Sequence, residues 1–255
     1  MGNLRYKPII ENMTWSFSRV ETFESCPYRW FLKYIKNYKD EDQFFATYGS
    51  FMHKLIERFY RGELTENQML SAFLKDFKNE IRGYRPQPTV VENYINDGVN
   101  YLRSFTRFPF EMIAVEKEMK FEIDGFPFIG YIDFIGKSDE GIVVVDNKSR
   151  NLKPRSGRDK PTLKDKELDT MLRQLYIYSE AIKQEFGVLP STLCFNCFRS
   201  STLIQEPFNN EAFIESKSWA VQKIKEIEDA EEFDKNENYF SCKYVCGVNR
   251  FCDRG

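Results

Sequence analysis

The stretch GYIDFIGKSDEGIVVVDNKSR, residues 130–150, decides the fold of this chain. Two runs rich in Val, Ile and Phe flank the polar residues SDEG at 138–141, which predicts two antiparallel strands joined by a tight turn. Because side chains alternate between the faces of a strand, Asp146 and Lys148 are expected on one face and Asn147 on the other. On the first strand, the residues expected to share a face are Tyr131, Asp133 and Ile135.

The predicted register of this hairpin brings two carboxylates together. If the turn comprises SDEG, Lys137 faces Ile142 and Asp133 lies directly opposite Asp146. Opposed residues have Cβ atoms about 4.5–5.5 Å apart, so the carboxylates would repel each other unless a divalent cation such as Mg²⁺ or Mn²⁺ lay between them. Lys148, beside the cation, is suited to orienting water and neutralising phosphate charge. The alternative is a solvated hairpin tip, although the apolar run before Asp146 favours a site because buried charges need partners.

The rest of the sequence predicts a mixed α/β fold. Helices are expected over residues 16–37 (with a break at Pro27), 49–60, 65–82, 90–106, 167–186 and 210–230. Strands are expected over 112–122, 126–136, 142–148, 192–199 and 202–206, and a polar loop over 149–166. From residue 90 the order is therefore helix, three strands, helix, strand, an αβββαβ core.

We expect one domain over residues 1–255. Its parts are a helical amino-terminal extension (1–110), a sheet core with the helix 167–186 (111–208), and a helix with a cysteine-rich tail (209–255). The 255 residues are 42% hydrophobic and 30% charged, which excludes a disordered chain. No apolar run approaches the ~20 residues of a membrane span, and the amino end lacks the apolar stretch of a signal peptide. These features predict a cytoplasmic protein without membrane contact.

Several motifs together resemble the PD-(D/E)xK nucleases, specifically their RecB-like branch. They are G-x-I-D at 130–133, D-x-K at 146–148, Q-x-x-x-Y at Gln174 and Tyr178, and the group Gly49, Ser50 and His53. Glu116 resembles the acidic residue of the preceding strand, although Glu118 is expected on the same face and is an alternative. The matches run in family order from residue 16 to 252, and they imply a restriction-endonuclease-like αβββαβ core.

The resemblance also implies which residues hold a metal ion. Asp133 and Asp146 would bind Mg²⁺ or Mn²⁺, and the backbone carbonyl of Asn147 would be a further ligand. His53 would approach the ion from the helical side, and Glu116 would support the ion or its water. Asn147 departs from the family pattern, in which an aromatic or aliphatic residue is commoner. Without the family, a lone histidine such as His53 is more often structural.

Three further residues have roles implied by the family. Lys148 would be the catalytic lysine, and Gln174 would hold this lysine or the substrate phosphate. Tyr178 would contact nucleic acid or pack behind Gln174. The spacing of four residues places Gln174 and Tyr178 on one side of a helix, where alone they would be an ordinary helix surface.

Three of the six cysteines are gathered at the end of the chain. Cys242, Cys246 and Cys252 form C-x₃-C-x₅-C, a spacing that packing alone rarely explains, and a tetrathiolate site needs a fourth ligand. Cys194 and Cys197 lie in a predicted strand, where their spacing sends them to opposite faces. We therefore expect these two to be ordinary core residues.

Cys26, in the phrase SFSRVETFESCPYRWFLKYI, is the better fourth ligand. This phrase and the tail resemble the Fe–S subset of RecB-like nucleases, of the AddB type and the CRISPR-associated Fe–S exonucleases. There, one amino-terminal cysteine and three near the carboxyl end hold a [4Fe–4S] cluster, which implies a structural cluster on Cys26, Cys242, Cys246 and Cys252. Three residues separate Cys242 from Cys246, where the family commonly has two. Zn²⁺ therefore remains the alternative, because four cysteines also suit zinc.

The net charge of −2, from 37 basic and 39 acidic residues, gives no global sign of nucleic-acid binding. Residues 148–166, however, carry eight Lys or Arg against two Asp. Directly after the catalytic strand, such a segment is suited to closing over a phosphate backbone, whereas on its own it would be a solvated loop. The candidate DNA-binding residues are Arg150, Lys153, Arg155, Arg158 and Lys160, together with Tyr178.

These observations predict a Mg²⁺- or Mn²⁺-dependent DNA nuclease. The resemblance favours an exonuclease on single-stranded ends, commonly from the 5′ end, in recombination, repair or CRISPR adaptation. A helicase or a CRISPR or recombination protein is a candidate partner, since the chain has no G-x-x-x-x-G-K-[ST] loop of its own for ATP. The alternatives are a non-catalytic Fe–S subunit that binds DNA ends or acts as a scaffold, and a zinc-stapled endonuclease.

Overall fold

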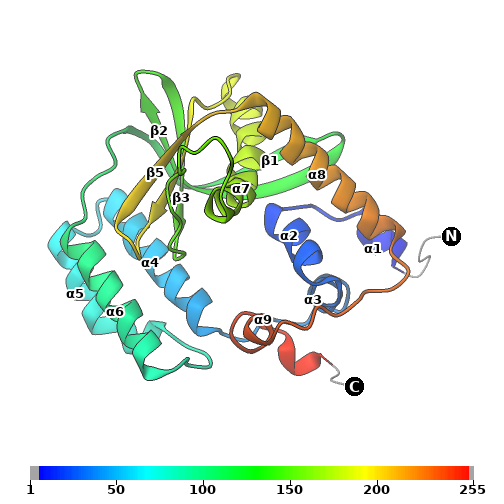
Figure 1. Ribbon diagram of the computed structural model, residues 1–255, viewed down its shortest axis with the longest axis horizontal. Helices are drawn as coiled ribbons and strands as arrows, with labels where there is room; N and C mark the ends of the chain where they lie inside the picture. Colours follow the sequence, from blue (N-terminus) through cyan, green and yellow to red (C-terminus); the bar gives the residue numbers. More distant parts are fainter. Residues whose placement is uncertain (1–5, 253–255) are drawn as a thin grey trace.

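The computed structural model describes residues 6–252, in which a five-stranded sheet lies between two groups of helices (Figure 1). The helices are α1 (Lys7–Glu11), α2 (Phe17–Ser25), α3 (Pro27–Trp30), α4 (Phe44–Tyr60), α5 (Glu66–Glu80), α6 (Pro88–Arg103), α7 (Leu163–Phe186), α8 (Asn210–Asp229) and α9 (Tyr239–Tyr244). A π-helical turn (Phe31–Ile35) follows α3, and a 3₁₀ turn (Asn249–Phe251) follows α9.

The strands are β1 (Glu111–Ile123), β2 (Phe126–Ser138), β3 (Gly141–Lys148), β4 (Thr192–Cys197) and β5 (Thr202–Pro207). They lie in the sheet in chain order, and only β3 and β4 are parallel. A parallel pair needs a crossover connection, which α7 provides. The order α6–β1–β2–β3–α7–β4 thus has the predicted αβββαβ pattern, and the mixed α/β fold is confirmed.

Two hydrophobic cores cover the two faces of the sheet, and alternation along the strands separates them. Val144 packs in a core with α1–α3, α7 and α8, here called the α7-side core. Val143 and Val145 pack in a core with α4–α6, the α4-side core. Cys194 and Cys197 are fully buried on opposite faces, as predicted. No helix in the described part of the chain is long and apolar enough to cross a membrane.

One predicted helix boundary is confirmed and another differs from the prediction. The break expected at Pro27 is confirmed: α2 stops at Ser25 and Pro27 begins a new turn, because proline suits the first position of a helix but not its interior. α7 begins at Leu163 instead of 167, because Thr162 and Asp165 form a capping box. The polar loop is correspondingly shorter than predicted.

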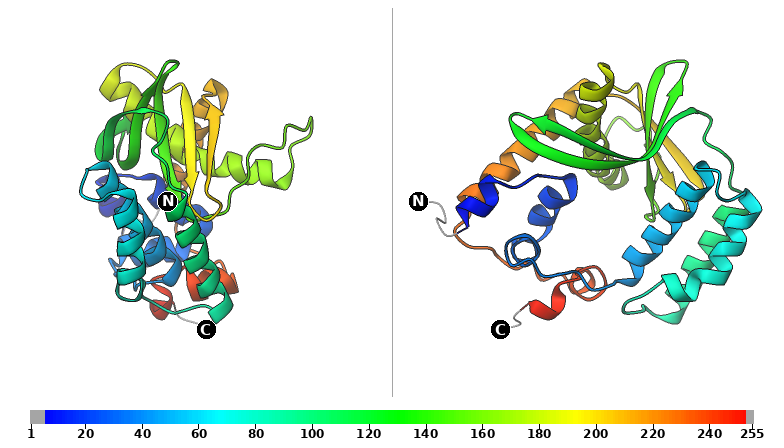
Figure 2. Two further views of the ribbon diagram at one scale, coloured as in Figure 1. Left: turned by 90° about the vertical axis from the view of Figure 1, so that its left-hand side faces the viewer. Right: turned by 180° about the vertical axis from the view of Figure 1, so that it is seen from behind.

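The carboxy-terminal tail joins two parts of the chain that are far apart in sequence. In Figure 1 and in the right-hand view of Figure 2, α9 lies between α3 and the start of α4. Arg29 donates a hydrogen bond to the carbonyl of Val245 (3.3 Å), and the backbone N–H of Glu41 donates to the carbonyl of Gly247 (2.8 Å). The tail therefore contacts both the segment around α3 and the segment that leads into α4.

Candidate active site

An irregularity in the β1–β2 hairpin, where side chains stop alternating regularly between the faces of the sheet, positions the acidic residues Glu116 and Asp133. Glu116 lies between the β1–β2 pairs Val115–Phe134 and Lys117–Ile132, so its position in the register is opposite Asp133. Its φ of 46° is in the left-handed region, which costs about 1–3 kcal/mol for a residue other than glycine. Such cost is commonly tolerated where function requires the conformation.

At Asp133, opposite Glu116, the alternation of side chains between the two faces of β2 is interrupted. Ile132 and Ile135 both pack in the α7-side core although they are three residues apart, while Phe134 packs in the α4-side core. Regular alternation would place Tyr131 with Ile135, yet Tyr131 is 53% exposed and Ile135 is fully buried. The prediction that these two share a face is wrong, because the irregularity opposite Glu116 interrupts the period of two.

The predicted register of the β2–β3 hairpin is confirmed from the turn as far as Phe134 and Val145. Lys137 pairs with Ile142, and the last pair is Phe134–Val145. Asp133 and Asp146 are one step beyond that pair, and the backbone N–H of Asn147 donates to Asp133 Oδ2 (2.6 Å). The two carboxylates are therefore neighbours at the end of the ladder, but they are not a ladder pair.

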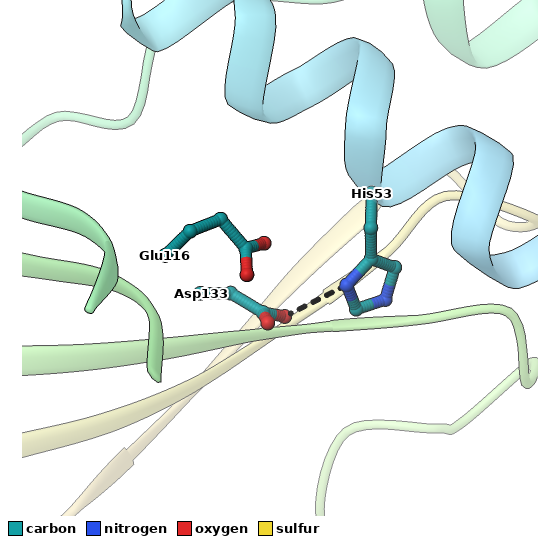
Figure 3. A group of neighbouring side chains, drawn as sticks. All are labelled: His53, Glu116 and Asp133. Atoms are coloured by element: carbon teal, nitrogen blue, oxygen red, sulfur yellow. Dashed lines mark ion pairs between the residues drawn. The ribbon is translucent and has the colours of Figure 1, made fainter. Parts of the chain in front are cut away.

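His53 reaches this point from α4. Its Nδ1 lies 3.3 Å from Asp133 Oδ2, and its Nε2 lies 2.9 Å from the carbonyl oxygen of Asn147. Ligand atoms of His53, Glu116 and Asp133 all lie within 4.8 Å of one another, and Figure 3 shows the three side chains converging. An imidazole, two carboxylates and a nearby carbonyl form a donor set that suits Mn²⁺ or Mg²⁺.

The mutual proximity of these groups changes their proton affinities. Burial alone would lower the pKa of His53, but the Asp133 carboxylate, assisted by Asp146 and Glu116, outweighs it and raises the pKa to about 9. Burial and the charge of Asp133 raise the pKa of Glu116 to about 7. Without a cation, protons therefore compensate part of the negative charge of the site.

The second half of the site is a chain of polar contacts between β3 and α7. Lys148 Nζ donates to Gln174 Oε1 (2.7 Å), and Gln174 Nε2 donates to Asp146 Oδ1 (2.9 Å) and to Tyr178 Oη (3.1 Å). Lys148 Nζ also forms an ion pair with the buried Asp146 Oδ2 at 2.8 Å. An ionised carboxylate offers about four acceptor positions, so Asp146 keeps lone pairs for a cation beside these contacts.

Tyr178 is buried behind Gln174, and Gly130 explains why it fits. A Cβ atom at position 130 would lie 2.7 Å from Tyr178 Cε1, closer than side chains can pack. The glycine of the G-x-I-D motif therefore makes room for the tyrosine ring, which is 8% exposed. The structure thus gives Tyr178 a place behind Gln174 and away from the surface.

The unusual residue Asn147 has its own partners on the opposite face of β3. Asn196 Nδ2 donates to Asn147 Oδ1 (2.7 Å) and to Tyr101 Oη (2.7 Å), and Asn147 and Asn196 are neighbours in the parallel pair of β3 and β4. Sequence reasoning missed Asn196 and Tyr101. The only signal was the polar residue at position 147, because a buried amide requires a hydrogen-bonding partner.

Glu118, which the sequence offered as an alternative to Glu116, has different surroundings from Glu116. Glu118 Oε2 accepts a hydrogen bond from the hydroxyl of the exposed Tyr131 (2.6 Å), whereas Glu116 joins His53 and Asp133. The left-handed φ of Glu116 separates the two, because it breaks the alternation that would keep them on one face.

The basic segment after β3 is partly fastened to the body of the protein. Arg155 lies 2.8 Å from Glu206 and 2.9 Å from Asp169, and Asp165 accepts hydrogen bonds from the backbone and the hydroxyl of Ser156. The guanidinium of Arg155 is thus already paired with two carboxylates. Side chains that are exposed in the same segment are Arg150, Lys153, Arg158 and Lys160.

The four cysteines expected to act together line one cavity. Cys26, Cys242, Cys246 and Cys252 all face a cavity of about 680 Å³ between α3 and α9. Cys26 Sγ accepts hydrogen bonds from the backbone N–H groups of Arg29 (3.4 Å) and Asn236 (3.5 Å). Burial raises the pKa of Cys246, and the neighbouring Cys26 and Cys242 raise it further.

Known proteins resemble this chain in fold and in sequence pattern. A crystal structure from Eubacterium rectale, named "Putative exonuclease", matches with a TM-score of 0.57 and 15% identity, covering 98% of this chain and 90% of its own. A second structure, named "SSO0001", has 15% identity over 98% of this chain and 97% of its own, with a TM-score of 0.29. No curated protein matches the chain. The family model of the PD-(D/E)XK nuclease superfamily matches residues 14–253. This chain therefore belongs to the PD-(D/E)XK nuclease superfamily.

Proposed function

We propose that this protein is a Mg²⁺- or Mn²⁺-dependent deoxyribonuclease that removes nucleotides from single-stranded DNA ends, with the 5′ end favoured. Nucleases of this superfamily use divalent metal ions. The observation that carries the proposal is the convergence of His53, Glu116 and Asp133 beside the Asp146–Lys148 pair. The name of the Eubacterium rectale protein supports exonuclease action.

The residues of the site divide into ligands and groups that act on water and phosphate. His53, Glu116, Asp133 and Asp146 would hold the ion, with the Asn147 carbonyl as a further ligand. When bound, a divalent cation stabilises charge on the phosphodiester oxygens and acidifies the attacking water. Lys148, held by Gln174 and Asp146, is placed to orient that water and to neutralise developing charge on the phosphate.

The exposed basic residues after β3 support the approach of DNA. Arg150 follows the catalytic lysine by two residues, and the side chains of Lys153, Arg158 and Lys160 are exposed in the same segment. Positive side chains here would contact the phosphate backbone and make binding depend on salt. Arg155, being paired with Glu206 and Asp169, would instead fasten the segment to the body of the protein.

The thiol cluster supports placement in the RecB-like branch that carries a [4Fe–4S] cluster. The wide cavity, the four cysteines on it and the backbone N–H donors to Cys26 Sγ fit such a group, since hydrogen bonds to sulfur tune Fe–S sites. The cluster would have a structural role, because it would connect α3 with the tail and so contribute to folding. The proposal includes a role in recombination, repair or CRISPR adaptation, with a helicase or other protein partner.

Iron content tests the cluster. Anaerobically purified wild type is expected to be coloured and to contain about four irons, whereas Cys242→Ser loses iron and unfolds at lower temperature. Cys194→Ala, which alters a buried core thiol away from the cavity, is the matched control and should keep its iron. Full iron content and stability in Cys242→Ser would refute the cluster.

DNA cleavage tests the activity and its polarity. Single- and double-stranded oligonucleotides, labelled at the 5′ or the 3′ end, are incubated with Mn²⁺, and a circular DNA serves as a substrate without ends. Release of short labelled products from single strands supports the exonuclease. Absence of cleavage by the wild type favours the non-catalytic Fe–S subunit, and a colourless protein that nicks circular DNA favours the zinc-stapled endonuclease.

A further inference from the structure

A group of aromatic side chains, three of them exposed and two half-buried, gathers around a lysine where the tail meets α4. This tail aromatic surface consists of Phe45, Tyr84, Tyr239, Phe240 and Tyr244. Tyr239 is 73% exposed, Tyr84 56% and Phe240 54%. Large exposed aromatic groups gathered in one place commonly mark a binding surface.

The surface is held together by ring contacts and by one central cation. The ring of Phe45 on α4 lies 5.7 Å from that of Phe240 and 6.2 Å from that of Tyr244 on α9. Lys243 Nζ lies 5.1 Å from the ring of Tyr84, 5.2 Å from that of Tyr239 and 5.3 Å from that of Tyr244. Flat π faces beside a positive charge match the bases and the phosphates of one nucleic-acid strand.

Two acidic residues of the segment before α4 are already paired with basic side chains and so oppose this match less. Asp40 lies 2.6 Å from Lys33 Nζ, and Glu41 lies 2.6 Å from Arg250 Nη1. Both acidic residues lie in the segment that connects the π-helical turn to α4, and their basic partners lie in that turn and in the 3₁₀ turn of the tail. They remove part of the negative charge that would otherwise repel a phosphate backbone.

One side of α4 connects the tail aromatic surface to the candidate metal site. Phe45, Gly49 and His53 follow one another at intervals of four residues, so they lie along one side of the helix. At 1.5 Å per residue, Phe45 is about 12 Å from His53 along the axis. Gly49 lies between them, and a Cβ there would be 3.7 Å from Ser149 Oγ, so this side of α4 faces the chain just after β3.

We propose that the tail aromatic surface stacks the unpaired bases of a single DNA strand whose cleaved phosphate lies at the site of His53 and Asp133. The separation of about 12 Å is at most three or four nucleotides, because each nucleotide of a strand advances by at least roughly 3.4 Å, the value for a duplex. In Figure 1, α9 lies beside the start of α4, and the end of β3 lies beside a later part of the same helix. This inference rests on the proposed nuclease function and adds the residues that select single strands.

Binding measured without cleavage tests the surface separately from the nuclease activity. Fluorescence anisotropy is recorded for a labelled 20-nucleotide single strand and a blunt duplex of the same length, with Ca²⁺ in place of Mn²⁺. The double variant Tyr239→Ala/Phe240→Ala is expected to bind the single strand at least about tenfold more weakly. Phe240→Tyr keeps a ring face at position 240 and leaves the Tyr239 hydroxyl, to which Lys243 Nζ donates (2.8 Å), in place, so it should bind as the wild type does.

A matched control and a salt titration sharpen the test. Leu74→Ala removes another exposed apolar side chain, on α5, and should leave DNA affinity unchanged. Lys243→Gln should make the dependence of log K on log salt less steep by about 0.7, the value for one phosphate contact to a single strand. Melting temperature and iron content are compared for every variant, because α9 also carries Cys242.

The outcomes separate this inference from the proposed function. Unchanged single-strand affinity in the double alanine variant, or an equal loss on the duplex, overturns the aromatic surface even if the wild type cleaves DNA. Failure of the wild type to bind single strands overturns it as well. Selective loss of single-strand binding supports the surface, including when the wild type shows no cleavage with Mn²⁺, a result that counts only against the nuclease.

Discussion

Lys148 Nζ donates a 2.7 Å hydrogen bond to Gln174 Oε1, which joins strand β3 to the helix α7. The same glutamine donates to Asp146 through its amide nitrogen (2.9 Å). One neutral side chain therefore fixes the positions of both the lysine and a candidate metal ligand. Its flat amide group is suited to this, because it presents an acceptor and a donor at once.

Replacing Gln174 should reduce activity more than stability. In Gln174→Ala, Lys148 and Asp146 lose their shared partner, and we expect a 10- to 100-fold lower kcat/KM, typical for groups that orient metal ligands. Gln184→Ala is the control, since Gln184 also lies on α7 but bonds to Glu122 and Glu180. Steady-state cleavage of single-stranded DNA and thermal unfolding are measured together, and equal activity in the two variants would contradict this role.

Metal binding should become tighter as pH rises. In the absence of metal, the pKa of Glu116 is about 7 and that of His53 about 9, so below pH 7 both groups carry protons that the ion must displace. Between pH 7 and 9 His53 still binds a proton, and above pH 9 neither competes. The Mn²⁺ concentration that gives half-maximal activity should therefore fall between pH 6.5 and 9.

Proton release gives an independent check of the same competition. Calorimetric titration with Mn²⁺ at pH 8, in two buffers of different ionisation enthalpy, should show release of about one proton by the wild type. His53→Ala should release markedly less, because Glu116 is already largely ionised at that pH. Identical proton release by both proteins would exclude His53 as the group that the metal deprotonates.

Gly130 should be intolerant of even one additional carbon. The methyl group of Gly130→Ala would meet the ring of Tyr178 at 2.7 Å, and overpacking of this kind costs about 1–3 kcal/mol of unfolding free energy. Displacement of the tyrosine would also disturb its 3.1 Å contact with Gln174, so activity should fall. Denaturant unfolding and cleavage rates are the measurements.

A compensating substitution tests whether the clash with Tyr178 causes the loss of stability in Gly130→Ala. Tyr178→Leu in the Gly130→Ala background provides space for the methyl group, so the double variant should be more stable than the sum of the two single effects predicts. Additive losses of stability would show that Gly130 acts through another contact.

The sequence was most informative where the structure is governed by local periodicity. The separation of Asp146 and Lys148 from Asn147, and of Cys194 from Cys197, follows directly from alternation along a strand. The register of the β2–β3 hairpin was predictable because its short turn fixes which residues face each other.

Features that depend on contacts between distant segments could not be predicted in this way. The left-handed backbone conformation of Glu116 directs its side chain away from that of Glu118. No periodic pattern in the sequence predicts this conformation. Likewise, the pairing of Arg155 with Glu206 depends on how β5 packs beside the basic segment. Resemblance to a family supplied His53 as a candidate, because a lone histidine in a helix carries no such signal.

The most direct test of the central claim is the single-turnover rate at which the wild type and Lys148→Ala cleave an end-labelled single DNA strand with Mn²⁺. Lys137→Ala is the control, because this exposed lysine lies at the far end of the same hairpin. We predict that Lys148→Ala cleaves at least about 100-fold more slowly, while Lys137→Ala cleaves at the wild-type rate. Equal rates for the wild type and Lys148→Ala would contradict the assignment of the active site.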